Sequence, residues 1–388
     1  MKKDFKTVLK DNTMVIVLVL VYLFFTITTK GSMFLPMQFN ALITQNAYVF
    51  ILACGMLMCI LTGGNIDLSC GSFVCTLGAI GGYLMVIKGM GTGVSIVLLL
   101  LISVIYGCVL GYLIAYVDVP PWIATLAGYL AFRGLGTQIL SSNSSTGSIA
   151  PFPQTFLDIF SGKIFATKLN VLNIPCLTVG IVASLLLAFF SLRDRANRVK
   201  RGYDADPMGQ EVLRGVAIDA VIMLFAYKLA MAGGIPTVLI WAAAIVLLFH
   251  FITSKTTIGR HFYVVGGNKE AARLSGINTR RVMFVAYLNM AVITGITTFT
   301  VMARFQAANS TAGTNYEMDA ISACFVGGAS AYGGSGTVPG MLVGALLIGV
   351  INLGMSLMGI DANLQKVVKG VVLLAAVAFD IISKRNKK

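Results

Sequence analysis

The residues that could do chemistry in this sequence are few and widely separated. Six ionisable residues lie within or beside apolar stretches where membrane-spanning helices are expected: Asp67, Arg133, Asp219, Lys228, Arg304 and Lys369. Ionisable groups inside a membrane usually belong to ion or solute pathways, or pair with one another. Asp67 lies at a glycine-rich break, and Asp219 and Lys228 lie near a helix end or a hairpin. Capping or pairing therefore explains them at least as well as a pathway does.

The sequence contains no set of residues with the spacing of an enzyme active site. It has only two histidines in 388 residues, no Ser/His/Asp or Cys/His grouping, no zinc-ligand spacing and no GxxxxGK[ST] nucleotide-binding loop. The seven cysteines show no paired spacing and mostly lie in apolar runs, as is typical of small buried side chains. We therefore expect no catalytic residue, no metal site and no nucleotide bound by this chain.

The most distinctive polar motif is the stretch 259–281, GRHFYVVGGNKEAARLSGINTRR. Asn268 is a good helix N-cap, and Gly276 is a good left-handed terminator. The pattern predicts a helix of about two turns over 269–275, with Glu270 in its first turn and Arg273 near its end. Such a short helix is marginal by itself and must pack on something. It is either a solvated loop between two membrane helices or a docking element for a soluble partner.

The composition is that of an integral membrane protein. The chain is 57% hydrophobic and 11% charged, with a mean hydropathy of +0.86, whereas soluble domains carry about 25% charged residues. The net charge is +14, and the Lys and Arg residues cluster at the N-terminus, in 193–214, in 255–281 and in the tail 384–388. This clustering is typical of cytoplasmic loops and termini rather than of a nucleic-acid-binding face.

The apolar runs predict an all-α polytopic membrane protein with about 10–12 membrane helices, including interrupted ones, in a single domain spanning 1–388. Expected spans are 14–29, 42–61, 73–87, 93–117, 122–140, 172–190, 216–232, 237–251, 282–303, 338–358 and 365–382, with a short run at 321–326. The first is expected to be a retained span rather than a cleaved signal. Parity places both termini, the charged loop 191–214 and the loop 255–283 in the cytoplasm, and the loop 141–170 outside.

Glycine-rich breaks interrupt the apolar pattern once in each half of the chain. The residues concerned are Gly63, Gly64, Asp67 and Gly71 in the first break, and Gly327, Gly328, Gly333 and Gly334 in the second. Corresponding breaks suggest two loosely repeated halves with a solute pathway between them. Alternatively, the glycines simply allow close helix packing.

Several of these stretches together resemble the permease subunit of bacterial ABC importers for monosaccharides, of the ribose/xylose/arabinose type. They are LTGGNIDLSCGSF (61–73), PPWIATLAGYLAFRGLG (120–136), GRHFYVVGGNKEAARLSGINTRRV (259–282), GTNYEMDAISACFVGGASAYGGSGTVPG (313–340) and LQKVVKGVVLLAAVAFD (364–380). The resemblance covers nearly the whole chain in the family's order and implies a type II-like ABC importer permease fold.

The resemblance also implies partners. A cytoplasmic ATPase subunit, which binds ATP and Mg, would dock on the EAA-like coupling loop 255–283. The residues assigned to coupling are Asn268, Lys269, Glu270, Ala271, Ala272, Arg273, Leu274, Gly276 and Ile277. The chain itself would need no cofactor and would not be an enzyme. It would form a homodimer in the bacterial inner membrane, surrounded by lipid, and receive solute from an extracytoplasmic sugar-binding protein.

The sequence leaves the substrate and the driving force open. The full segments 191–214 and 216–251 favour the xylose and multiple-sugar permeases over shorter ribose-type members, but related permeases carry nucleosides or branched-chain amino acids. An ion-coupled secondary carrier is a further hypothesis, and a membrane enzyme or structural membrane partner is another. Polar membrane residues that could contact a sugar, or merely bond helix to helix, are Gln45, Asn46, Tyr48 and Asn289.

Overall fold

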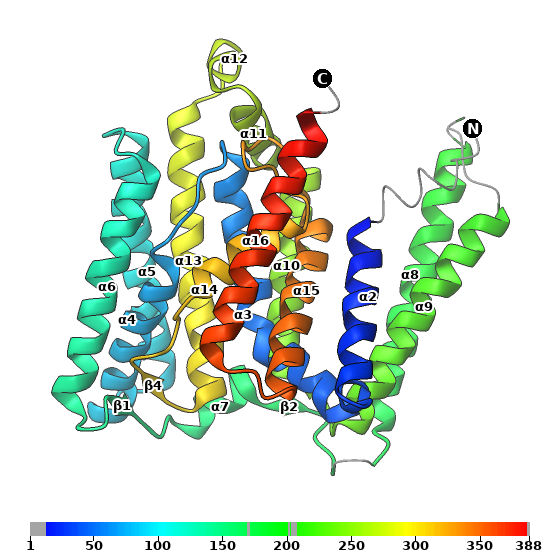
Figure 1. Cartoon of the computed structure of the whole chain (residues 1–388), viewed down its shortest axis with the longest axis horizontal. Coiled ribbons are helices and arrows are strands. Elements are labelled where there is room, and N and C mark those ends of the chain that lie inside the picture. Colours follow the sequence, from blue (N-terminus) through cyan, green and yellow to red (C-terminus); the bar gives the residue numbers. More distant parts are fainter. Residues whose placement is uncertain (1–12, 169–170, 201, 203–207, 386–388) are drawn as a thin grey trace.

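The computed structural model describes residues 13–168, 171–200, 202 and 208–385, and most of these are helical (Figure 1). The long helices are α2 (Thr13–Thr28), α3 (Pro36–Leu61), α5 (Thr92–Ala115), α6 (Pro121–Asn143), α8 (Ile174–Lys200), α9 (Met208–Met231), α10 (Thr237–Lys255), α13 (Thr279–Phe305), α15 (Val338–Leu357) and α16 (Ala362–Arg385). The short ones are η1 (Ser32–Phe34), α4 (Cys70–Gly82) with the π-helical extension η2 (Tyr83–Ile87), α7 (Gln154–Ser161), α11 (Thr257–Gly267), α12 (Lys269–Leu274) and α14 (Tyr316–Val326).

Within these residues, seven helices are long and apolar enough to cross a membrane: α3, α4 with η2, α5, α8, α10, α13 and α15. The apolar helix α2, which has 16 residues, and the longer helices α6, α9 and α16 lie alongside them (Figure 1). The only strands described are two-residue pairs, β1 (Ser148–Ile149) with β4 (Ala308–Asn309) and β2 (Lys163–Ile164) with β3 (Ile235–Pro236). The predicted all-α polytopic fold is confirmed.

The bundle has two unlike ends. Figure 1 shows α11, α12, the C-terminal end of α16 and the adjoining ends of α8 and α9 at one end, which we call the α12 face. Helix α7 and both strand pairs lie at the opposite end, which we call the α7 face. The expected extracytoplasmic loop 141–170 is therefore at the opposite end from the expected coupling loop. The expected cytoplasmic N-terminal segment, residues 1–12, lies outside the described residues.

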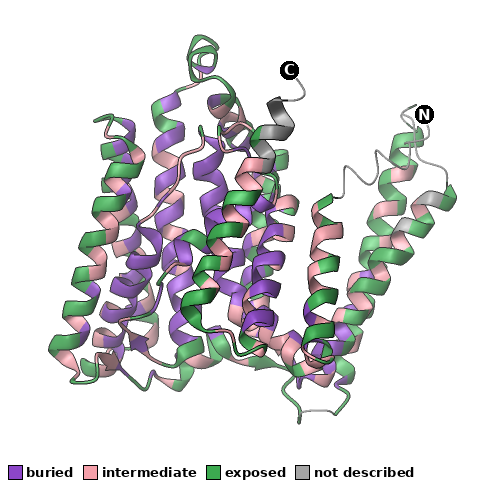
Figure 2. Cartoon of the chain, in the orientation of Figure 1, coloured by how far each residue is buried: buried purple, intermediate pink, exposed green. Residues whose placement is uncertain are grey.

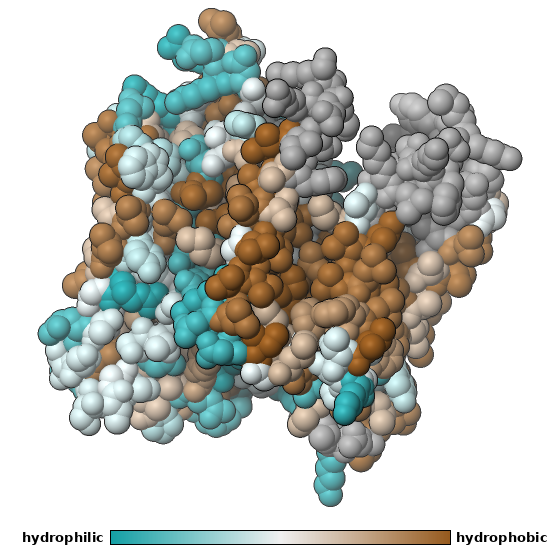
Figure 3. Space-filling model, viewed as in Figure 1, coloured by the Kyte–Doolittle hydropathy of each residue, from teal (hydrophilic) through white to brown (hydrophobic). Residues whose placement is uncertain are grey.

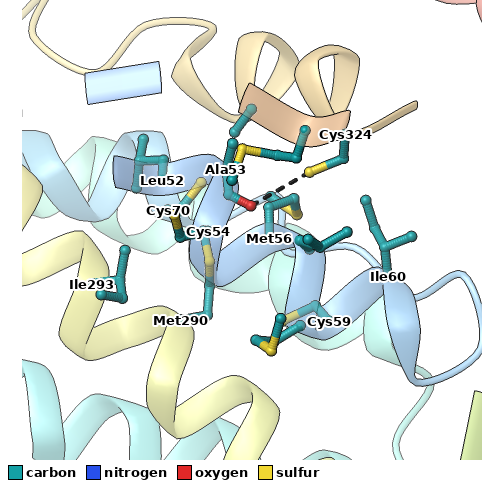
Figure 4. Packing of buried hydrophobic residues seen from close by; sticks show 14 of the residues in the cluster. Leu52, Ala53, Cys54, Met56, Cys59, Ile60, Cys70, Met290, Ile293 and Cys324 are labelled. Atoms are coloured by element: carbon teal, nitrogen blue, oxygen red, sulfur yellow. Dashed lines mark hydrogen bonds between the residues drawn. The ribbon is translucent and has the colours of Figure 1, made fainter. Parts of the chain in front are cut away.

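Helix α3 forms the centre of the bundle because its part from 47 to 61 is apolar on all sides. Its residues from Ala47 to Leu61 are all buried, and Figure 2 shows the burial concentrated on α3 and its neighbours. Sulfur-containing side chains fill much of this contact, including Cys54, Met56 and Met290 (Figure 4). The Cys324 thiol donates to the carbonyl oxygen of Ala53, 3.4 Å away. Small and flexible sulfur side chains suit such tight helix packing.

The α8–α9 hairpin is attached to the bundle near the α7 face. Lys228 of α9 donates to the carbonyl oxygen of Phe34 at 2.6 Å, and its ammonium lies 3.9 Å from the centre of the Phe34 ring. The predicted turn after α9 is present, with positive φ at Gly233 (+87°) and Gly234 (+127°). Lys228 thus anchors a helix end instead of lining a pathway through the bundle centre.

One predicted loop is shorter than expected. The charged segment 191–214 was expected to be a loop throughout, but α8 continues as helix to Lys200 and α9 begins at Met208. Arg and Lys have high helix propensity, so a basic segment can extend a membrane helix beyond its apolar part. Residues 201 and 203–207 of this loop lie outside the described residues.

The two glycine-rich breaks occur in reversed order. In the first half, the non-helical segment 62–69 precedes the short helix α4. In the second half, the non-helical segment 327–337 follows the short helix α14. Inverted-topology repeats keep the order of their elements along the chain and reverse only their direction across the membrane, so this order by itself does not relate the two halves by an inverted repeat.

Candidate coupling site

The short helix α12 is built as its sequence predicts. The Asn268 side chain accepts a hydrogen bond from the backbone N–H of Ala271 at 2.9 Å, which satisfies one of the free donors at the helix start. At the other end Gly276 has φ +81°, and the N–H of Ile277 donates to the carbonyl of Ala272 at 3.0 Å. The predicted helix over 269–275 is confirmed with bounds Lys269–Leu274.

Helix α12 stands out from the α12 face (Figure 1) and is mostly exposed. Ala272 is its one fully buried residue, and Ile277 is half-buried. Leu274 is 84% exposed, the largest value for any large apolar residue in the described part of the chain. The Glu270–Arg273 ion pair, 3.3 Å, is also exposed and contributes little stability. The helix therefore offers an apolar side chain and charged groups to something outside the bundle.

The segments on either side of α12 hold it at a fixed place. Asn278 accepts a hydrogen bond from the N–H of Arg281 at 2.9 Å and so caps α13. On the other side, Phe262 and Val265 of α11 are buried in the main core. The Tyr263 hydroxyl donates to the carbonyl of Gly336 at 2.9 Å, and burial raises the pKa of Tyr263, so the group remains a proton donor at neutral pH.

The C-terminal end of α11, just before α12, touches both glycine-rich breaks. The N–H of Gly334 donates to the carbonyl of Leu61, the last residue of α3, at 3.1 Å. A Cβ at Gly266 would overlap that carbonyl and lie 2.6 Å from the Gly334 nitrogen. A Cβ at Gly333 would lie 2.8 Å from the nitrogen of Gly64. We call this backbone-to-backbone contact the glycine junction, defined as Gly63, Gly64, Gly266, Gly333 and Gly334.

The other break residues lie elsewhere. A Cβ at Gly71 would overlap the Glu317 carboxyl at the start of α14, and one at Gly327 would lie 2.6 Å from the Gly340 carbonyl carbon at the start of α15. Gly328 has φ +88° and open space around it, so it serves a turn. The structure therefore brings together four of the predicted break glycines and separates the remaining three.

Asp67 has a local partner. Its carboxylate accepts from the Ser69 N–H at 2.8 Å and the Ser69 hydroxyl at 2.6 Å, just before α4 begins. The side chain is 1% exposed. These contacts form a local turn before α4, so Asp67 has the structural pairing that was one of the roles open to it.

Two of the polar membrane residues bond helix to helix. Asn46 of α3 accepts from Asn352 of α15 at 3.3 Å. Tyr48 of α3 donates to Asp319 of α14 at 2.5 Å. Both bonds are of the kind that holds membrane helices together.

A cavity of about 380 Å³ lies beside the glycine junction and opens at the α12 face. Its lining includes Thr62, Gly63, Asn65, Asp118, Pro120, Gly266, Lys269 and Met283. It therefore extends from the end of α3 to the start of α12 and to the turn between α5 and α6. Arg280 pairs with Asp118 across this region at 3.6 Å. The cavity leaves space for α12 and the α5–α6 turn to approach each other.

Sequence reasoning missed Gly266. The contact joins residues near positions 61, 266 and 334, which no local pattern relates. The signal in the sequence was the pair Gly266-Gly267 directly before the Asn268 cap, because paired glycines also mark the two breaks.

The chain is a helical membrane bundle with two glycine-rich breaks, and these breaks meet next to the exposed helix α12. Such an arrangement is the architecture of a transport permease. The chain belongs to the family described as the permease component of the branched-chain amino acid transport system, which matches residues 38–377. It is therefore a multi-pass membrane protein of a transport family and not an enzyme.

Similar proteins extend over almost the whole chain. The xylose transport system permease protein of Haemophilus influenzae is 33% identical over 374 residues, which cover 96% of each chain. The xylose permease protein of Escherichia coli K12 is 32% identical, covering 96% of this chain and 92% of its own. The ribose import permease protein of Bacillus subtilis is 30% identical, covering 89% and 85%. No solved structure gives a significant match.

Proposed function

We propose that this chain is the transmembrane permease subunit of an ATP-binding-cassette importer that moves a monosaccharide into the cytoplasm. Family membership over residues 38–377 supports the transport role. The names of the relatives, xylose and ribose permeases at 30–33% identity, support a sugar as the solute. The higher identity to the xylose proteins favours a pentose such as xylose.

Helix α12 is the observation that carries the coupling role. We assign Asn268–Leu274 with Gly276 and Ile277 as the contact for a separate ATPase subunit, which binds ATP and Mg. Exposed Leu274 would insert into that partner, and buried Ala272 would keep the helix seated on the permease. The other permease copy of a homodimer would present an identical α12 to a second ATPase.

The orientation follows from charge. Basic residues of the α8 end and of 255–281 lie at the α12 face, and such residues favour the cytoplasmic side. We therefore place the α12 face and both termini in the cytoplasm. The α7 face, which carries the described residues of the 141–170 loop, then faces the extracytoplasmic sugar-binding protein of a bacterial inner membrane.

The glycine junction gives the coupling a physical route. When the ATPase closes and displaces α12, Gly266 moves with it. Gly266 touches the end of α3 and the second break directly, with no side chain between. Displacement of α12 would therefore shift both breaks together, and this shift would open the path for the sugar to one side and close it to the other.

The decisive test is reconstitution of the purified chain with its ATPase and sugar-binding protein in vesicles. We expect ATP-dependent uptake of D-xylose, and Leu274→Asp should weaken ATPase association by about 2 kcal/mol or more, the usual loss at a central interface residue. The matched control is Phe165→Asp, a 48% exposed apolar residue near the α7 face, which should leave the association intact.

Two outcomes would contradict the coupling to a separate ATPase. One is a wild-type chain that never associates with an ATPase. The other is uptake that survives ATP depletion and stops with an uncoupler, as an ion-coupled carrier requires. If ATP-driven uptake occurs but excludes sugars, the chain is instead a nucleoside or branched-chain amino acid permease, and competition by these solutes would identify it.

A further inference from the structure

A polar, non-helical segment, residues 310–315, lies on the surface of the bundle at membrane depth, and we call it the strip. Residues 310–315 connect β4, at the α7 face, to α14, which begins within the height of the bundle (Figure 1). Thr311 and Thr314 are exposed, and Ser310 and Asn315 are half-buried. Figure 3 shows hydrophilic surface at this height beside the hydrophobic surface of α16. Irregular backbone at membrane depth persists only where water or protein covers it, so this strip does not face lipid tails.

The inner side of the strip is fixed to the bundle. Arg133 of α6 donates to the carbonyl oxygens of Ser310 at 3.1 Å and Ala312 at 3.0 Å. The guanidinium thereby satisfies two carbonyl groups that no helix satisfies. Arg133 therefore holds the backbone of the strip against the bundle, and the polar side chains of Thr311 and Thr314 stay exposed on its outer side.

At the inner end of the strip lies a pocket of about 140 Å³ between α14 and α16. Asn315, Met318 and Ser322, spaced three and four residues apart, provide one wall. The other wall is provided by Lys366, Lys369, Gly370 and Leu373. Polar side chains between packed membrane helices usually bond across the contact, but neither Asn315 nor Ser322 has such a side-chain bond within the described residues. For scale, a cavity of about 150 Å³ takes up a six-membered ring such as benzene.

A buried ion pair without net charge forms the back of the pocket. Lys369 pairs with Asp319 at 2.9 Å, and that carboxylate also accepts from the Tyr48 hydroxyl at 2.5 Å. Tyr48 in turn stacks on Tyr316, with ring centres 3.7 Å apart. Because Asp319 is 2% exposed, the pair cannot rearrange without a large cost.

The Lys366 ammonium, which also lines the pocket, donates to the Asn363 side chain at 3.3 Å. The two uncharged polar side chains of the pocket are free to receive a ligand. The Asn315 amide and the Ser322 hydroxyl form no side-chain hydrogen bond to any residue within the described ranges, although Ser322 is only 2% exposed. An uncharged polyhydroxylated ring needs such donors and acceptors for its hydroxyl groups. Met318 and Leu373 supply apolar surface for its C–H face.

We propose that the strip 310–315 lines a water-filled route and that the α14–α16 pocket is a binding site for the transported sugar on that route. The assignment rests on the proposed sugar importer function. It gives that function a location within the membrane, some distance from α12.

Gly370 allows the pocket to be filled without damage to the fold. A Cβ at Gly370 meets nothing within 4 Å, and the same holds for Gly134 on the exposed side of α6. Gly370→Leu should therefore fold, associate with the ATPase and lower D-xylose uptake by about tenfold or more, since pocket methylenes discriminate at that level. Gly134→Leu is the matched control and should transport normally. Undiminished uptake by folded Gly370→Leu, in a wild-type system that transports D-xylose, would overturn the assignment.

Cysteine labelling tests whether water reaches the pocket and whether D-xylose occupies it. Gly370→Cys in native membranes should react with a membrane-impermeant maleimide, and saturating D-xylose should slow this reaction about tenfold. Gly134→Cys lies on the exposed side of α6; we expect it to face lipid and therefore to remain unlabelled. Six of the seven native cysteines are buried. Equal labelling of both variants would contradict the site. So would labelling of Gly370→Cys that D-xylose does not slow, provided that the wild type transports D-xylose. Failure of wild-type uptake itself would instead refute the sugar importer function.

Discussion

At the scale of single residues, the closest contact of the coupling region is made by a residue with no side chain. Gly266 and Gly267 are adjacent and both precede the Asn268 cap, but they differ completely in surroundings. A Cβ at Gly266 would overlap the Leu61 carbonyl oxygen, whereas a Cβ at Gly267 meets nothing within 4 Å. This difference makes the pair a natural mutant and control.

Gly266→Ala should destabilise the chain by about 1–3 kcal/mol, as overpacking of a close contact does. The added methyl group must push apart the end of α3 and the segment around Gly334. Gly267→Ala should stay within about 0.5 kcal/mol of the wild type. Thermal unfolding of the purified variants in detergent measures both values. Equal melting temperatures for the two variants would show that the glycine junction is looser than described.

At the scale of elements, two asparagines act as N-caps on either side of the same loop. Asn268 caps α12, which has six residues, and Asn278 caps α13, which has 27. A cap contributes a far larger share of the stability of a short helix than of a long, packed one. The two positions therefore separate the formation of α12 from general damage to the loop.

Asn268→Ala should cost about 1 kcal/mol of helix stability and so weaken ATPase binding about fivefold. The same substitution at Asn278 removes a cap of similar geometry, yet α13 is buried along much of its length, so ATPase affinity should hardly change. Titration of the ATPase against detergent-solubilised permease measures both. Identical losses for the two variants would argue against α12 as the contact.

The sequence predicts most of the helices, but it does not predict which of them contact one another. Asn268 and Gly276 predicted α12 because caps act over a few neighbouring residues, and the apolar runs predicted the spans because length and composition are local too. The sequence does not predict the extension of α8 to Lys200, because charged residues indicate a solvated loop even where their helix propensity is high. The grouping of Gly63, Gly266 and Gly334 was missed because it depends on packing between distant segments.

At the scale of the whole molecule, the opposite ends of the bundle should lie on opposite sides of the membrane. Leu274→Cys lies on the α12 face, and Phe165→Cys lies near the α7 face; the two parent residues are 84% and 48% exposed. In intact cells with a permeable outer layer, an impermeant thiol reagent should label only Phe165→Cys. In inside-out vesicles it should label only Leu274→Cys. The reverse pattern would contradict the proposed orientation.

The glycine junction also has a consequence for genetics. A steric clash between two side chains can be relieved by a smaller residue at either position, so suppressor mutations often arise at the partner. Here the atoms that a Gly266→Ala methyl group meets are the carbonyl of Leu61 and the nitrogen of Gly334, which every amino acid carries. A substitution at Leu61 or Gly334 leaves these backbone atoms in place. Selection for restored growth on the transported solute should therefore return the original glycine codon rather than second-site changes at the contact.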